Sequence, residues 1–206
     1  MPFAAQHIRD ARNHLRKHDP VMRSIIQSVG PFTAKTHRNR FKSLAMAIVS
    51  QQISGKAAKT IWERLENRIA PEDVTAAAIL NFSIDELRDV GVSRQKAGYL
   101  NDLAIWVDRG QLQLNQMGRK SDEEVIQALT QVKGIGRWTA QMFLIFTLAR
   151  LDILPVDDLG IRSAIKQAYE LPDLPSASEM QIMAKPWRPY ASVASWYLWQ
   201  SLDSSS

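Results

Sequence analysis

The amino-acid sequence predicts an all-α protein, and three observations support this prediction. Apolar residues recur at helical spacing along most of the 206 residues, and the strict alternation that is typical of half-buried strands is absent. Asp19 followed by Pro20 is a helix start, with a capping carboxylate and a proline at the first turn. Capping boxes, in which a serine precedes a glutamate by three positions, mark further helix starts at Ser83 with Glu86, Ser121 with Glu124, and Ser176 with Glu179.

The helical segments of the second and third quarters can be placed in order. A polar break over 30–39, which contains glycine and proline, precedes an apolar run that predicts a helix over 41–52. Residues 122–131 predict another helix. The apolar run 138–148 has helical length and spacing, and its helix should end near Arg150. Asp158 is then expected at the start of the following helix.

Composition limits the classes to which this protein can belong. The net charge of +5 favours an anionic partner, although an excess of this size is also common in proteins that bind none. The absence of cysteine excludes disulfides, thiol catalysis, and cysteine-ligated zinc or iron–sulfur sites. Residues 2–18 are polar and charged, and no later run could span a membrane. We therefore expect a soluble protein of the cytoplasm.

The most informative segment is 132–140, with the sequence Val-Lys-Gly-Ile-Gly-Arg-Trp-Thr-Ala. Glycines two positions apart between helices permit a tight turn and leave backbone amides accessible, so that a phosphate can approach the next helix's positive end. A dinucleotide fold is excluded, because Thr139 replaces the third glycine and the preceding segment is helical. The pattern favours a sequence-independent grip on a nucleic-acid backbone.

The distribution of positive charge agrees with this interpretation. Phosphate contacts are expected at several of the basic residues that lie in or beside the loops, although a solvated helix face explains any single one equally well. These residues are Arg38, Arg40, Lys42, Lys56, Lys59, Arg94, Lys96, Lys133 and Arg137.

Three separated segments together resemble one known family. They are 48–54 (Ile-Val-Ser-Gln-Gln-Ile-Ser), 132–140 with 154–160 (Leu-Pro-Val-Asp-Asp-Leu-Gly), and 185–190 (Lys-Pro-Trp-Arg-Pro-Tyr) with Trp196. Over roughly residues 20–200 the chain resembles the helix-hairpin-helix DNA glycosylases, and within them the alkylated-base group typified by 3-methyladenine DNA glycosylase II.

The resemblance implies a two-lobed all-α fold with the active-site cleft between the lobes. The central lobe, which carries the hairpin, would span 40–150, and residues 1–39 with 151–206 would form the second lobe. The implied activity is monofunctional hydrolysis of the bond between an alkylated purine and deoxyribose in double-stranded DNA, as a step of base excision repair. Substrates would be 3-methyladenine and 7-methylguanine, with ethenoadenine and hypoxanthine as further candidates.

The family motifs also assign roles in the reaction. Asp158 takes the catalytic position, and Asp157 is expected to cap the helix. Trp138, Met142 and Trp196 would form the base pocket. Well-known bacterial relatives have an aromatic residue at the position of Met142, and bifunctional relatives have a lysine nucleophile at that of Trp138. Because an indole cannot form a Schiff base, no strand cleavage is expected.

The remaining implied roles concern DNA and ions. Gln52 aligns with the side chain that fills the gap left by the flipped base, and an ordinary helix-terminal glutamine explains it equally well. No cofactor is implied, but the carbonyls of Thr130, Val132 and Gly134 map to a structural Na⁺ or K⁺ site. The expected DNA-binding set is Gln52, Ser54, Gly134, Gly136, Arg137 and Thr139.

Alternatives remain at this stage. Asp157 and Asp158 could both serve only as caps, and the tryptophans could belong to the core. His7, His14 and His18 form a helical stripe, which we interpret as partly exposed histidines and not as a zinc site. A non-catalytic binder of distorted DNA is the main rival function, and an all-α protein-interaction module is a third. We expect a monomer that works where the cell's DNA is, in the nucleoid or a nucleus, with no membrane partner.

Overall fold

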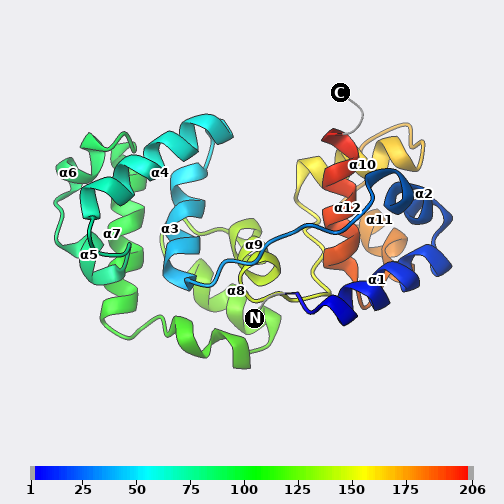
Figure 1. The fold of residues 1–206 in the computed structure, drawn as a ribbon, viewed down its shortest axis with the longest axis horizontal. Helices are drawn as coiled ribbons and strands as arrows, with labels where there is room; N and C mark the ends of the chain where they lie inside the picture. The colour runs from blue at the N-terminus through cyan, green and yellow to red at the C-terminus, as the bar shows by residue number, and fades with distance from the viewer. Residues whose placement is uncertain (1–2, 204–206) are drawn as a thin grey trace. The chain divides into compact units, whose positions relative to one another are not determined.

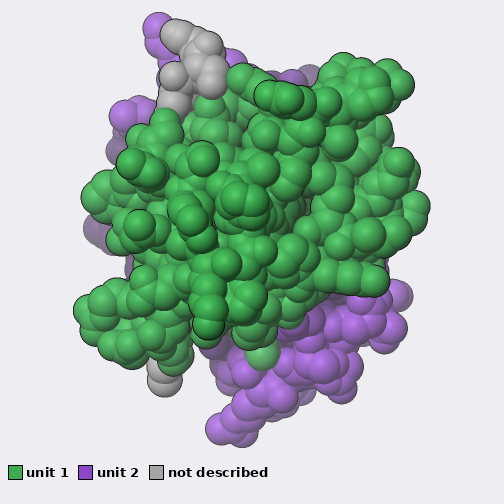
Figure 2. Space-filling model, turned by 90° about the vertical axis from the view of Figure 1, so that its right-hand side faces the viewer, with its two compact units in different colours: residues 1–36, 144–206 green, residues 37–143 purple. Residues whose placement is uncertain are grey.

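A computed structural model gives the fold of the chain and describes residues 3–203. Every regular element among these residues is helical, so the predicted all-α class is confirmed (Figure 1). Among residues 3–203, none of the helices combines the length and the hydropathy of a membrane span. The chain forms two compact units, Met1–Thr36 with Leu144–Ser206 (unit 1) and His37–Phe143 (unit 2), which Figure 2 shows in different colours.

The unit boundaries differ from those expected at residues 40 and 150. The units change over at 36–37 and again at 143–144, within the helix α9 (Arg137–Phe146). The later boundary falls inside this helix because its last turn packs into unit 1, where the Phe146 ring lies 5.9 Å from that of Trp199. The boundary between the lobes that was expected after this helix, at residue 150, therefore lies a few residues earlier in the structure, at 143–144.

Unit 2 is a cluster of helices built from one continuous segment. Its central element is α7 (Arg94–Asp108), which packs against α3, α5 and α6 through buried residues that include Leu100, Leu103 and Ala104. The other elements of the unit are α3 (Arg40–Ser50), α4 (Gly55–Ile69), α5 (Ala76–Leu80), α6 (Ile84–Asp89), the 3₁₀ helix η1 (Leu114–Arg119), α8 (Asp122–Thr130) and most of α9.

Unit 1 joins the two ends of the chain around one core. Its central helix is α12 (Ala191–Asp203), whose residues 191–198 are all buried and which packs against α2 and α10. Leu15, Met22, Ile165 and Tyr197 are among the side chains of this core. The other elements are α1 (Ala5–His18), α2 (Pro20–Val29), α10 (Leu159–Ala168), α11 (Ala177–Met183) and the 3₁₀ helix η2 (Lys185–Trp187).

The predicted helix starts are confirmed, because capping is a local interaction. All three capping boxes form in both directions, at the first residues of α6, α8 and α11. The predicted helices over 41–52 and 122–131 are found as α3 and α8, with ends displaced by one or two residues. The helix predicted from the apolar run 138–148 is found as α9, which ends at Phe146 and not near Arg150 as expected. The break over 30–39 contains no helix.

Asp19 does more than cap α2. Its Oδ1 accepts hydrogen bonds from the amides of Val21 (2.9 Å) and Met22 (3.0 Å). Its Oδ2 accepts from the Tyr169 hydroxyl at 2.5 Å and from Trp187 Nε1 at 2.8 Å. Burial, together with this hydrogen bond to a carboxylate, raises the pKa of Tyr169 well above its ordinary value. One buried carboxylate therefore links the N-terminal helices to residues about 150 positions later.

Candidate functional site

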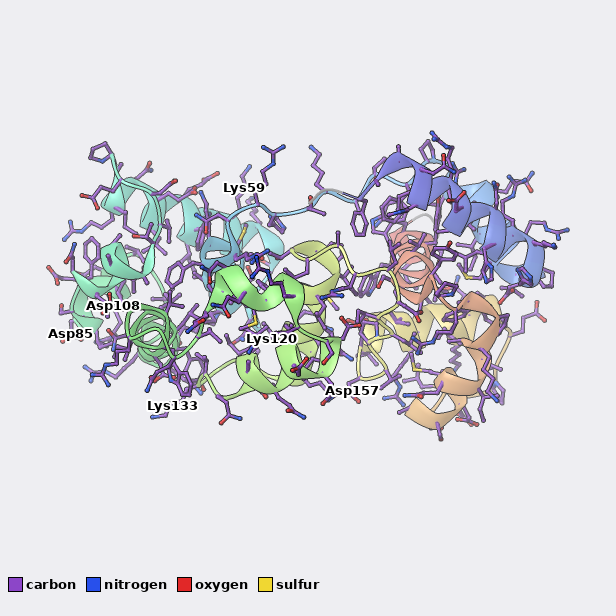
Figure 3. The ribbon with its side chains drawn as sticks, turned by 90° about the horizontal axis from the view of Figure 1, so that it is seen from below. Lys59, Asp85, Asp108, Lys120, Lys133 and Asp157 are labelled. Atoms are coloured by element: carbon purple, nitrogen blue, oxygen red, sulfur yellow. The ribbon has the colours of Figure 1, made fainter. Side chains whose placement is uncertain are left out.

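Asp158 is a nearly buried carboxylate at the first turn of α10, with 9% of its surface exposed. Its Oδ1 accepts hydrogen bonds from the amide of Ile161 at 2.8 Å and from Trp199 Nε1 at 3.0 Å. The prediction that Asp157 caps the helix is wrong. The amide of Asp158 donates to the carbonyl of Pro155 at 3.1 Å, and this turn makes Asp158 the capping residue and leaves Asp157 exposed (labelled in Figure 3).

Trp199 is a contact of this carboxylate that the sequence motifs did not indicate. It lies one helical turn after Trp196 on α12, and that spacing was the only signal that could have pointed to it. Gly160 leaves room for the contact. A Cβ at this glycine would lie 3.1 Å from Asp158 Oδ1 and 3.4 Å from Trp199 Cδ1. The aspartate is thus held by α10 on one side and by an indole N–H on the other.

The three residues expected to form a base pocket lie in both units. Trp138 is in the first turn of α9 and 43% exposed, and Met142, one turn later, is half-buried; both belong to unit 2. Trp196 belongs to unit 1 and is only 7% exposed, with its ring 4.5 Å from that of Phe32 and 4.9 Å from that of Tyr197. Most of the Trp196 indole therefore serves the core, and its place in a shared pocket stays a prediction.

The glycine-containing turn joins α8 to α9, as the sequence predicts for a helical hairpin. Gly134 has φ +84°, a conformation that favours glycine, and a Cβ at this position would overlap the Tyr99 ring. The first amide that donates along α9 is that of Ala140, to the carbonyl of Gly136 at 3.0 Å. The Thr139 amide comes one residue before this first donor. Gly136 is exposed, and no other atom lies close to the position of a Cβ. Thr139 is buried, with only 5% of the residue exposed, so its contact with DNA stays a prediction.

The hairpin turn borders a hollow of about 500 Å³ in unit 2. Other segments fix the turn from this side: Gln51 Nε2 donates to the Gly134 carbonyl at 2.8 Å, and Asp102 Oδ2 accepts from the Lys133 amide at 2.9 Å. Gln52 follows α3 with φ +55° and is exposed. Ser54 caps α4, accepting from the Ala57 amide at 3.3 Å, so its hydroxyl already has one role within the fold.

The basic residues divide into two groups. Arg40, Lys42, Lys59, Arg94 and Arg137 each interact within unit 2, as in the contact of Arg137 with both carboxylate oxygens of Glu123 at 2.9 and 3.1 Å. Of the nine basic residues expected near the loops, three are exposed and form no ion pair or side-chain hydrogen bond within residues 3–203, namely Arg38, Lys56 and Lys133. These three are the better candidates for phosphate contact. The ninth, Lys96, donates to two carbonyls.

Two of the carbonyls proposed as cation ligands already accept hydrogen bonds within the protein. The carbonyl of Val132 accepts from the Ile135 amide at 3.1 Å, and that of Gly134 accepts from Gln51. A carbonyl oxygen has two lone pairs, so each retains one for a monovalent ion. Elsewhere, no cluster of three or more histidine, aspartate or glutamate side chains among the described residues could hold a metal. His14 Nε2 instead lies 2.9 Å from the Pro186 carbonyl.

Comparisons with known proteins agree with this arrangement. Residues 45–189 match the family model described as HhH-GPD superfamily base excision DNA repair protein. An alkylbase DNA glycosidase-like protein, mag2 of Schizosaccharomyces pombe, is 31% identical over 195 residues, which cover 92% of each chain.

Two solved structures are also similar. The 3-methyladenine DNA glycosylase Mag1 of Schizosaccharomyces pombe, in complex with abasic DNA, superposes with a TM-score of 0.84 at 31% identity, covering 94% of this chain and 97% of that one. A DNA-3-methyladenine glycosidase from Bacillus halodurans gives a TM-score of 0.83 at 33% identity, covering 93% and 88% of the two chains.

Proposed function

Because the chain belongs to the HhH-GPD superfamily of base excision DNA repair proteins, we propose that it is a monofunctional DNA glycosylase for alkylated purines. Its substrates would be 3-methyladenine and 7-methylguanine in double-stranded DNA, with ethenoadenine and hypoxanthine as further candidates. The names of its relatives, which are glycosylases and glycosidases of 3-methyladenine and alkylated bases, support this substrate class. The protein would act as a monomer wherever the cell keeps its DNA, in a nucleoid or a nucleus.

The observation that carries the proposal is the environment of Asp158. Its carboxylate is nearly buried and is held by two N–H donors, one from the backbone of α10 and one from Trp199. When the bond between C1′ of the sugar and the base nitrogen breaks, its electron pair leaves with the base and positive charge develops on the sugar. A carboxylate fixed near that charge lowers the barrier by electrostatic stabilisation and needs no rearrangement during the reaction.

For 3-methyladenine and 7-methylguanine, the remaining steps require water but no acid. A purine methylated at N3 or N7 is already cationic, so it departs as a neutral base without a proton. Water then adds to C1′ and loses a proton, for which Asp158 is the proposed acceptor. The base must first leave the helical stack, since no side chain reaches this bond in an intact duplex. Unstacking is easiest where pairing is already weakened, which contributes to selectivity for damaged bases.

Trp138 supports both the substrate class and the absence of lyase activity. Its exposed indole offers a face to a cationic base, an attraction of about 0.5 to 2 kcal/mol. It also occupies the position at which bifunctional relatives have a lysine, and it has no amine to form a Schiff base. The product would therefore be an unbroken strand with an abasic site.

The grip on DNA would combine backbone amides with free cations. The amides of Gly136 and Thr139 lie at the positive end of α9, where a phosphate oxygen is favoured. The exposed cations Arg38, Lys56 and Lys133 would add salt-dependent contacts. A structural Na⁺ or K⁺ held by the hairpin carbonyls of Thr130, Val132 and Gly134 would fix the turn, and no other cofactor is proposed.

The adjacent aspartates provide a matched test. Duplex DNA treated with a methylating agent is incubated with the wild type, with Asp158→Asn or with Asp157→Asn, and the released bases are quantified by chromatography. We expect Asp158→Asn to slow release by about 100-fold or more, because it removes the charge that stabilises the transition state. Asp157→Asn should stay near the wild-type rate, since that side chain is exposed and does not cap α10. Strand breaks should appear only after alkali.

Other outcomes would separate the alternatives. Equal release by the wild type and Asp158→Asn would move catalysis to another residue. Tight binding of lesion-containing DNA without release of any base by the wild type would favour a non-catalytic binder of damaged DNA. A borohydride-trapped covalent adduct would contradict the monofunctional mechanism.

A further inference from the structure

The side chain of Lys96 holds the turn after α3, and Gln51 of that turn is hydrogen-bonded to the hairpin turn, which is far away in the sequence. We propose that Lys96 is a positioning residue: it fixes the turn after α3 against the hairpin, so that Gln52 and the hairpin amides engage DNA as one surface. The inference rests on the proposed function, because it requires DNA to bind there. It departs from the expectation that Lys96 is one of the phosphate contacts.

The Lys96 ammonium is directed at the end of α3. Its Nζ donates to the carbonyls of Val49 at 2.8 Å and Gln51 at 2.6 Å. The last carbonyls of a helix have no partner within the helix and carry its negative end, so a cation stabilises them. The side chain is partly buried there, and desolvation lowers the pKa of Lys96. Two of the three N–H groups of the ammonium are thus occupied inside the protein.

Gln51 extends the connection to the hairpin. Its carbonyl accepts from Lys96, while its side-chain amide donates to the carbonyl of Gly134 at 2.8 Å. Tyr99, one turn after Lys96 on α7, packs on Gly134 so closely that no Cβ fits, and its hydroxyl accepts from Gln95 Nε2 at 2.5 Å. One face of α7 therefore supports both turns.

Gln52 is the residue whose placement depends on this support. It has φ +55°, in the left-handed region that non-glycine residues avoid. Such a conformation persists where the surrounding contacts impose it. Here Gln51 is held by Lys96 on one side of Gln52, and Ser54 is fixed as the cap of α4 on the other. Loss of the Lys96 contacts should let Gln52 relax and weaken its action on DNA.

A phosphate contact and a positioning residue predict different salt dependences of the affinity for DNA. A lysine that contacts phosphate contributes about 0.9 to the slope of log affinity against log salt concentration. A positioning lysine leaves this slope unchanged, and its effect depends on the presence of the residue it positions. We would measure the affinity of a duplex that contains a tetrahydrofuran abasic-site analogue for the wild type, Lys96→Met, Gln52→Ala and the double variant, over a series of salt concentrations.

We expect Lys96→Met to weaken binding by about tenfold at every salt concentration with an unchanged slope. Gln52→Ala should weaken binding in the wild-type background and have no further effect beside Lys96→Met. A second variant, Gln51→Met, keeps every charge but breaks the bond to Gly134, and it should reproduce the loss. Lys59→Met is the matched control. Lys59 (labelled in Figure 3) is exposed, and its ion pair, with Glu63 at 3.8 Å, lies on the surface of α4 and does not involve either turn. It reports the effect of removing one surface charge.

Three results would overturn the proposal: a slope reduced by about 0.9 in Lys96→Met, additive effects of Lys96→Met and Gln52→Ala, or affinities of Lys96→Met and Gln51→Met equal to that of the wild type. Thermal unfolding of each variant would show whether it is folded. If Lys96→Met does not fold, the affinity of Gln51→Met tests the proposal in its place. If the wild type does not bind the duplex, the proposed function itself fails, and this is visible without any variant.

Discussion

At the scale of single residues, Asp158 depends on two neighbours of different origin. The Ile161 amide follows it by three positions and is supplied by helix α10, as for any N-terminal cap. The Trp199 N–H comes from α12, 41 residues later. The hydrogen bond from the Ile161 amide is the one that any N-terminal cap makes, so it is no sign of a catalytic role. The second donor, Trp199, is not needed for capping and further restricts the orientation of the carboxylate.

Replacement of Trp199 by phenylalanine tests this contribution. Trp199→Phe keeps an aromatic ring next to Phe146 but removes the N–H donor at 3.0 Å from Asp158. A hydrogen bond to a charged group contributes about 1.5 to 3 kcal/mol, so we expect base release in single-turnover experiments to slow by about tenfold or more. The affinity for the abasic-site analogue should be unchanged. A loss of affinity with normal release at saturation would instead assign Trp199 to DNA binding.

At the scale of elements, the helical hairpin is defined by its turn. Its first helix starts at the Ser121 capping box, and its second begins at Arg137, which is paired with Glu123 of the first helix. The turn between them approaches α7 so closely that Gly134 has no room for a side chain. The two glycines of the motif thus have different tasks, since Gly136 has open space around it and is exposed.

Alanine at each glycine should separate these tasks. Gly134→Ala places a Cβ 2.8 Å from Tyr99 Cε2, with other ring atoms nearer still, in a residue with φ +84°. We expect it to lower the free energy of unfolding by about 2 to 3 kcal/mol and to weaken DNA binding. Gly136→Ala should leave the stability within about 0.5 kcal/mol of the wild type. Urea unfolding curves measure both effects, and equal stabilities of the two variants would contradict the close packing on Tyr99.

At the scale of the whole molecule, unit 1 is assembled from the two ends of the chain. Asp19, from the junction of α1 and α2, meets Tyr169 and Trp187 from the C-terminal part. The carboxylate is buried and accepts four hydrogen bonds, two from the backbone and two from these side chains. A buried charge of this kind is tolerated only when its hydrogen bonds are made.

The raised pKa of Tyr169 makes the stability of this unit depend on alkaline pH. Because the pKa is higher in the folded than in the unfolded protein, the stabilisation is fully present below about pH 10, the ordinary tyrosine value, and is lost as the pH rises above it. We expect the unfolding free energy of the wild type to fall by up to about 1.4 kcal/mol per pH unit more steeply than that of Tyr169→Phe above this pH.

Urea unfolding at about pH 8 and about pH 11 would measure the difference. Tyr197, whose pKa is also raised, is present in both proteins, so the comparison isolates Tyr169. At about pH 8, Tyr169→Phe should already be less stable by about 1 to 3 kcal/mol, because Asp19 loses one of its donors. Parallel pH profiles would contradict the hydrogen bond between Tyr169 and Asp19.

Features that depend on neighbouring residues could be predicted from the sequence. The all-α class, the three capping boxes and the helices α3, α8 and α9 follow from spacing and local hydrogen bonds, which are set within a few residues. The family motifs, which preserve order and spacing, identified the hairpin and singled out Asp158 as the catalytic candidate.

The contacts between distant groups became visible only in the folded chain. The choice of Asp158 over Asp157 as the cap depends on the turn at Pro155, which sets where α10 begins. Trp199 reaches Asp158, and Lys96 reaches the end of α3, across 41 and 45 or more positions that no local pattern spans. Such contacts form because helices pack by burying apolar faces, and that packing brings polar side chains together wherever the core places their helices.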